Sequence, residues 1–159
     1  MRRVVYLLAL LAAVAVAAGS LMAQTNPFVG TWKLNLAKSK YEGVPAPKSL
    51  TRTVTAEGGG LKYSFEGEAA DGSKISYSFT SKLDGSDAAV TGAGMMGGAD
   101  AVALSKLSAH KMSGITKKGG KEIGKASVDL SNDGKTVTVK TTGKLDGKDV
   151  KTEQVYDKQ

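Results

Sequence analysis

The stretch Asn26-Pro27-Phe28-Val29-Gly30-Thr31-Trp32-Lys33-Leu34 decides the fold that this sequence predicts. It follows an apolar N-terminal segment and contains the only tryptophan of the 159-residue chain. We expect it to form the first strand of a β-barrel. A large indole is buried well where strands converge, provided that its N–H finds an acceptor. Trp32 is therefore expected to plug one end of the barrel, which is a structural role.

The residues before this strand have the pattern of an export signal. A basic start and an apolar run at residues 4–18 are followed by small residues up to Ala23. The apolar run is shorter than the ~20 residues that a membrane-spanning helix needs. We therefore expect a signal peptide at 1–23, a mature domain at 24–159, and a periplasmic or secreted protein without a stable membrane anchor.

Composition narrows the classes of site that the chain can hold. The absence of cysteine excludes a disulfide, a thiolate nucleophile and a Cys-ligated zinc site. Loss of the two N-terminal arginines lowers the 22 Lys and Arg residues to 20, which against 15 acidic residues leaves a net charge of +5. This charge is spread along the chain. It favours solubility or contact with anionic cell-surface polymers, and a nucleic-acid partner is not expected.

From Ser49 onward, short runs alternate polar and apolar residues, as half-buried strands do; residues 61–66 and 75–80 show this most clearly. Turn dipeptides separate the runs: Asp71-Gly72, Asp84-Gly85, Gly119-Gly120, Asp133-Gly134 and Asp146-Gly147. Such pairs provide the positive φ angles of tight hairpins. We predict an all-β, up-and-down antiparallel barrel of roughly eight to ten strands, in preference to a sandwich, which needs longer crossing connections.

Residues 35–48 interrupt this pattern. Pro45 and Pro47 are incompatible with a regular helix, and the residues before them are biased toward extended backbone. We expect a surface loop that crosses one end of the barrel.

Residues 28–34 resemble the opening strand of lipocalins and cytosolic fatty-acid-binding proteins, which carry a Gly-x-Trp signature, here Gly30 and Trp32. The mature chain is also similar to small exported bacterial proteins described as lipocalin-like, within the calycin group. The resemblance implies a barrel whose tryptophan plugs the closed end. Lipocalins place an arginine from a late strand against that tryptophan. No arginine follows Arg52 here, so the pairing is absent or made by a lysine such as Lys158.

Arg52 is the only arginine of the expected mature chain. It alternates with Leu50 and Val54, so it can point into the barrel. A guanidinium there must be paired, either with the protein or with a ligand carboxylate or phosphate. Four aromatic residues at alternate positions of two neighbouring strands would share one inner face: Tyr63, Phe65, Tyr77 and Phe79. They either line a pocket for an apolar ligand or fill the core.

The remaining motifs give weak signals. Residues 92–97 have Gly-x-Gly-x-x-Gly spacing without the strand–helix context of a nucleotide site, so we expect a hairpin loop. Met95 and Met96 in this loop would form an apolar tip near the barrel mouth, either an entrance flap or a loop that touches a membrane. His110, the only histidine, is expected in a surface turn and makes a poor metal site.

Together these patterns predict a non-enzymatic exported protein that binds a small apolar or amphipathic molecule, for example a lipid or fatty acid. Arg52 would orient an anionic head, and no metal or cofactor is expected. The alternative is a structural or interaction protein of the cell envelope, with a filled barrel and a basic outer face. A barrel enzyme is a third, weaker interpretation. A solvent-connected cavity of roughly a few hundred Å³ would favour the first interpretation, and a filled interior would favour the second.

Overall fold

The computed structural model describes residues 26–159, so the expected signal peptide at 1–23 lies outside the described residues. The strands are β1 (Gly30–Leu34), β2 (Lys40–Glu42), β3 (Ser49–Glu57), β4 (Gly60–Glu68), β5 (Lys74–Ser81), β6 (Asp84–Ala89), β7 (Thr91–Ala93), β8 (Ala101–Lys106), β9 (Lys111–Lys118), β10 (Lys121–Leu130), β11 (Thr136–Leu145) and β12 (Lys148–Lys158). Two short 3-10 helices, η1 (Leu36–Lys38) and η2 (Met96–Gly98), are the only helices among residues 26–159. Neither could cross a membrane.

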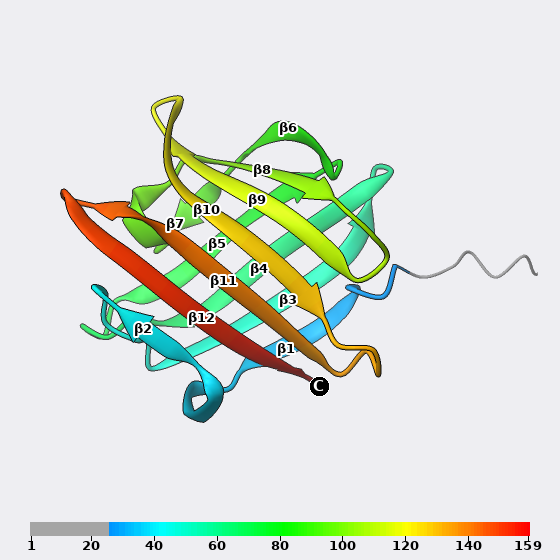
Figure 1. Cartoon of the computed structure of the whole chain (residues 1–159), viewed down its shortest axis with the longest axis horizontal. Coiled ribbons are helices and arrows are strands. Elements are labelled where there is room, and N and C mark those ends of the chain that lie inside the picture. The colour runs from blue at the N-terminus through cyan, green and yellow to red at the C-terminus, as the bar shows by residue number, and fades with distance from the viewer. Residues whose placement is uncertain (1–25) are drawn as a thin grey trace, which may run out of the picture.

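The strands form one antiparallel sheet that closes on itself (Figure 1). Hydrogen-bonded neighbours follow the order β6-β8-β9-β10-β11-β12-β1-β3-β4-β5-β7. The two ends of this path, β6 and β7, are consecutive in the chain, with only Val90 between them. Because β6 pairs with β8 and β7 pairs with β5, this single segment joins the two edges of the sheet. The predicted antiparallel barrel is therefore confirmed, although its sheet has 12 strands and not the predicted eight to ten.

The first and last strands also share an edge. β1 pairs with the C-terminal part of β12, and β2 pairs with β12 at residues 151–153. β1 and β2 thus follow one another along β12 as if they were a single strand. Side chains then alternate between the inside and the outside of the wall. In β3, for example, Leu50, Arg52 and Val54 are buried, whereas the threonines between them are partly exposed.

Four of the five predicted turn dipeptides lie in hairpins. The prediction at Asp84-Gly85 is wrong, because these residues open β6, where the register with β8 shifts between Asp84 and Asp87. The chain reverses earlier, at Leu83, which adopts a φ of 62°. Asp-Gly can serve a bulge as well as a turn, since both use the positive φ of glycine.

The predicted loop at 35–48 is only partly correct, because η1 and β2 lie within it. Asn35 caps η1 by accepting a hydrogen bond from the Lys38 backbone N–H. The Ser39 hydroxyl accepts one from the Val155 N–H, which fixes the segment to β12. The hairpin loop predicted at 92–97 is also partly wrong, because its first residues belong to β7 and pair with β5.

Trp32, which we predict to plug one end of the barrel, lies in the hydrophobic core. Its side chain is fully buried, and its Nε1 donates a hydrogen bond of 3.0 Å to the Phe28 carbonyl. The lysine expected in place of the lipocalin arginine is Lys158, whose Nζ lies 5.1 Å from the centroid of the Trp32 ring. Gly30, with a φ of 141°, leaves room for this contact, because a Cβ there would lie 3.0 Å from the Lys158 Cε.

Candidate functional site

The barrel contains a cavity of about 410 Å³. Its rim is formed by three connections: the β2–β3 loop, the β4–β5 turn and the segment around η2. Exposed rim residues such as Pro45 and Asp71 connect it to solvent. In Figure 1, β2 and β7, which flank two of these connections, lie toward the left. The wall is mostly aliphatic and aromatic, with contributions from β3, β4, β5, β8, β10, β11 and β12.

The four aromatic residues predicted to share one inner face do so, and all four line the cavity. Tyr63 stacks on Phe79 with ring centroids 4.9 Å apart, and Phe65 stacks on Tyr77 at 4.6 Å. The ring centroids of Phe65 and Phe79 are 6.2 Å apart, so these two residues connect the two stacked pairs. The pairs are direct neighbours in the β4–β5 ladder, so the period-two pattern of two adjacent strands produced the cluster.

Arg52 lies on the cavity wall with only 3% of its surface exposed. Its guanidinium carbon is 5.1 Å from the centroid of the Tyr63 ring. Within residues 26–159 it forms no ion pair with an acidic side chain, and its buried Nε has no hydrogen-bond partner. A buried cation without a counter-ion is costly. Arg52 therefore leaves a positive charge on the wall that a ligand anion could neutralise.

Neutral tyrosines surround this charge. Burial raises the pKa of Tyr63 and of Tyr77, and the positive charge of Arg52 opposes the rise only in part. Burial likewise raises the pKa of Tyr156. These phenols keep their protons at neutral pH, so none of them compensates Arg52. Among residues 26–159, Asp71 at the rim is the only acidic residue of the cavity lining.

Sequence reasoning missed a second polar group on the wall. Gln154 Nε2 donates a hydrogen bond to the Tyr41 hydroxyl at 3.2 Å, and Gln154 Oε1 accepts one from the Tyr156 hydroxyl at 3.3 Å. The alternation of Gln154 and Tyr156 in the last strand could have placed both inside. No local sequence pattern predicted that Tyr41 lines the cavity, because it lies within residues 35–48, which were predicted to form a surface loop.

Met95 and Met96 lie at the rim of the cavity and are half-buried, which matches their predicted position near the barrel mouth. The following residue, Gly97, packs so closely against Leu145 that a Cβ would lie 2.5 Å from its Cδ2. Lys118 Nζ donates a hydrogen bond of 3.3 Å to the Gly97 carbonyl. These contacts hold η2 against the β9–β10 and β11–β12 hairpins.

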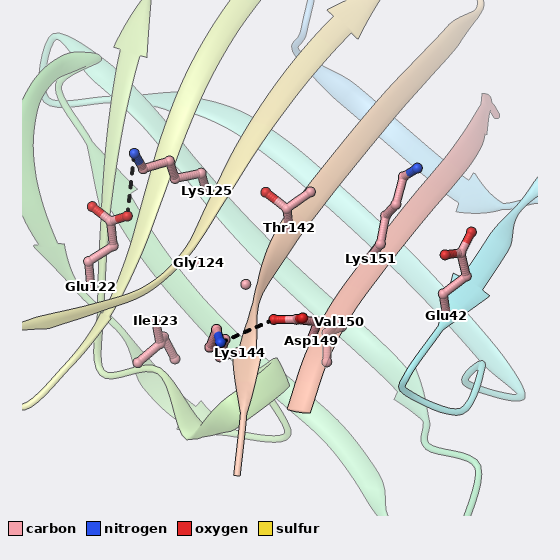
Figure 2. A pocket seen from close by; sticks show the side chains of 11 residues that line it. Glu42, Glu122, Ile123, Gly124, Lys125, Thr142, Lys144, Asp149, Val150 and Lys151 are labelled. Atoms are coloured by element: carbon pink, nitrogen blue, oxygen red, sulfur yellow. Dashed lines mark ion pairs between the residues drawn. The ribbon is translucent and has the colours of Figure 1, made fainter. Parts of the chain in front are cut away.

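A second depression, of about 690 Å³, lies around the outer ends of β10, β11 and β12 (Figure 2). Ion pairs border it, Lys125 with Glu122 at 3.6 Å and Lys144 with Asp149 at 3.4 Å. These side chains are largely exposed, and such pairs contribute about 0–1 kcal/mol. The depression lacks the desolvated apolar wall of the internal cavity, which makes the cavity the stronger candidate.

The histidine and the carboxylates of β4 lie away from the cavity. His110 is in the β8–β9 turn, where its Nδ1 is 3.3 Å from the Leu130 carbonyl oxygen. Glu66 and Glu68 form ion pairs with lysines on the outer surface. No group of three or more His, Cys, Asp or Glu side chains among residues 26–159 could hold a metal ion.

Two solved structures have a similar fold. The zebrafish ileal bile acid-binding protein complexed with cholic acid has a TM-score of 0.49 and 10% identity, covering 84% of this chain and 99% of its own. The siderocalin Ex-FABP, described as having dual ligand specificities, has a TM-score of 0.38 and 12% identity, covering 85% of this chain and 75% of its own. These likenesses concern the path of the chain and carry no conclusion about a ligand. No protein-family model and no curated protein matches the sequence.

Proposed function

We propose that this protein binds one small amphipathic anion inside its barrel and that it is not an enzyme. The observation that carries the proposal is Arg52, a buried guanidinium on the wall of an apolar cavity that has no counter-ion among residues 26–159. A carboxylate or phosphate would match the fork of guanidinium donors and neutralise the charge. The ligand head would therefore lie at Arg52.

The apolar body of the ligand would lie against the stacked aromatic residues. The cavity volume of about 410 Å³ is within the roughly 300–1,000 Å³ of small-molecule sites. Apolar surface removed from water contributes about 25 cal/mol per Å². This burial would supply most of the affinity, and Arg52 would supply orientation and preference for anions.

The alternative, a filled barrel that acts only through its basic outer face, is weakened by the cavity. Catalysis is not supported by the residues that line it. Among residues 26–159, the lining includes no histidine and a single carboxylate, Asp71, which lies at the rim. The lining therefore does not provide a general base next to a nucleophilic side chain.

We also propose that the protein is exported. The support is the basic start, apolar run and small residues of segment 1–23. N-terminal sequencing of protein isolated from its host should give Gln24 as the first residue. If protein isolated from outside the cytoplasm still began at Met1, the proposed cleavage would be wrong.

Native mass spectrometry of protein purified from its host tests the binding function. We expect a bound organic anion that is released on denaturation. Displacement of anilinonaphthalene sulfonate by long-chain carboxylates then measures affinity for wild type and for Arg52→Ala. Lys125→Ala removes an exposed outer cation and is the matched control. Equal affinity of wild type and Arg52→Ala for every anionic probe would overturn the proposal.

A further inference from the structure

Tyr41 and Gln154 form a fixed polar pair on the cavity wall. The Gln154 amide is held at both ends, by the Tyr41 hydroxyl at 3.2 Å and by the Tyr156 hydroxyl at 3.3 Å. β2 is held in register with β12, with Tyr41 opposite Thr152. The position of the Tyr41 hydroxyl is thus set by backbone pairing and by a side-chain hydrogen bond.

This hydroxyl keeps one unused hydrogen-bonding capacity. A phenol can donate one hydrogen bond and also accept, and here Tyr41 accepts from Gln154. No acceptor among residues 26–159 takes the Tyr41 hydrogen. Tyr41 is half-buried and lines the cavity. Burial raises the pKa of Tyr41, so the donor persists at neutral pH.

The pair lies at a different depth from Arg52. Arg52 is opposite Trp32, which is opposite Lys158 in β12, whereas Tyr41 is opposite Thr152 in the same strand. The two positions on β12 are six residues apart (158 − 152), or about 20 Å between Cα atoms at ~3.3 Å per residue. By this register, the backbone of Arg52 lies nearer the Trp32 end of the barrel and the backbone of Tyr41 lies nearer the rim, where the cavity opens.

We propose that the Tyr41 hydroxyl, positioned by Gln154, is a second recognition point of the cavity, and that the ligand carries an oxygen acceptor on its apolar body in addition to its anionic head. This inference rests on the proposed function. The ligand class is an oxygenated amphipathic acid, such as a hydroxy acid, rather than a plain alkyl carboxylate.

The chemistry of the pair explains why such a ligand is preferred. A site built to hydrogen-bond a ligand oxygen rejects the analogue that lacks it, because its own polar group then loses water without gaining a partner. One neutral hydrogen bond corresponds to about a tenfold difference in affinity. A bound ligand whose alkyl chain carries no oxygen would cover Tyr41 and leave its hydroxyl without an acceptor.

The test compares hexadecanoic acid with a set of hydroxyhexadecanoic acids in which the hydroxyl moves along the chain. Affinities are measured by displacement of anilinonaphthalene sulfonate from wild type, Tyr41→Phe and Ser127→Ala. The last variant is the control, since it also removes a hydroxyl from the barrel wall, one that is exposed on the outer face of β10. Circular dichroism confirms that all three are folded.

We expect wild type to prefer one hydroxyl position, or two neighbouring positions, about tenfold over the plain acid. Tyr41→Phe should lose this preference and keep its affinity for the plain acid, and Ser127→Ala should retain the preference. Equal binding of all acids by wild type, or an unchanged preference in Tyr41→Phe, would overturn the inference and leave the proposed function standing. Binding of no acid by folded wild type would overturn both.

Discussion

Lys158 Nζ lies 5.1 Å from the ring centroid of Trp32, so the last strand of the barrel covers the plug that the first strand provides. The two residues are also direct partners in the β1–β12 ladder. The contact depends on Gly30, whose missing side chain leaves space for the lysine stem. Residues from the two ends of the described chain thus seal the closed end together.

Replacement of Lys158 by alanine should lower the free energy of unfolding by about 0.5–1 kcal/mol, the usual contribution of an exposed cation–π contact. Lys158→Arg should retain most of it. Urea denaturation followed by Trp32 fluorescence measures both variants. Lys151→Ala, in the same strand, is the control. Equal stability of Lys158→Ala and this control would show that the contact does not stabilise the barrel.

Gly30→Ala should lower the free energy of unfolding by about 1–3 kcal/mol, because a φ of 141° is strained for any residue with a Cβ. The new Cβ would also lie 3.0 Å from the Lys158 Cε, and this close contact adds to the loss of stability. Combining Gly30→Ala with Lys158→Ala removes this approach and leaves the strain. The double variant should therefore lose less than the sum of the single variants. Strict additivity would exclude a steric contribution from Lys158.

Arg52→Met should affect stability and binding in opposite directions. A buried charge without a partner destabilises the empty protein, so an apolar side chain of similar length should raise its free energy of unfolding by about 1–4 kcal/mol. The same change should weaken binding of an anionic probe by about 100-fold, or about 2.7 kcal/mol. Denaturation without ligand and probe titration measure the two effects. A less stable Arg52→Met would mean that Arg52 is structural.

Stability should fall in acid partly through Asp157. The hydrogen bond from Asn35 Nδ2, 2.7 Å long, and the nearby Lys38 ammonium lower the pKa of Asp157 below its ordinary 3.8. A carboxyl whose pKa is lower in the folded protein contributes stability above pH 3.8 and loses it as the pH falls through the folded value. Asp157→Asn should therefore flatten the pH dependence of unfolding below pH 4. An unchanged acid limb in this variant would contradict the assignment.

The features that the sequence predicted correctly are local. Alternation within a strand placed Tyr63 and Phe79 on the inner face, and glycine-containing dipeptides marked most hairpins. The features it could not predict depend on distant pairing. Tyr41 and Gln154 are 113 residues apart and meet only because β2 pairs with β12. Likewise, Arg52 has no counter-ion within the described part of the chain because none of the strands that face it places an acidic side chain there, and no local pattern encodes this.

The division of β6 and β7 at Val90 has a consequence for the motions of the barrel. Only three residue pairs, 76–78 with 91–93, join β5 to β7, whereas ten pairs join β11 to β12. Local opening is easiest where few hydrogen bonds must break together. The amides of residues 91–93 should therefore exchange with deuterium before those of the β11–β12 ladder. The β5–β7 ladder is therefore where the barrel wall can open locally while the other strand pairs remain hydrogen-bonded.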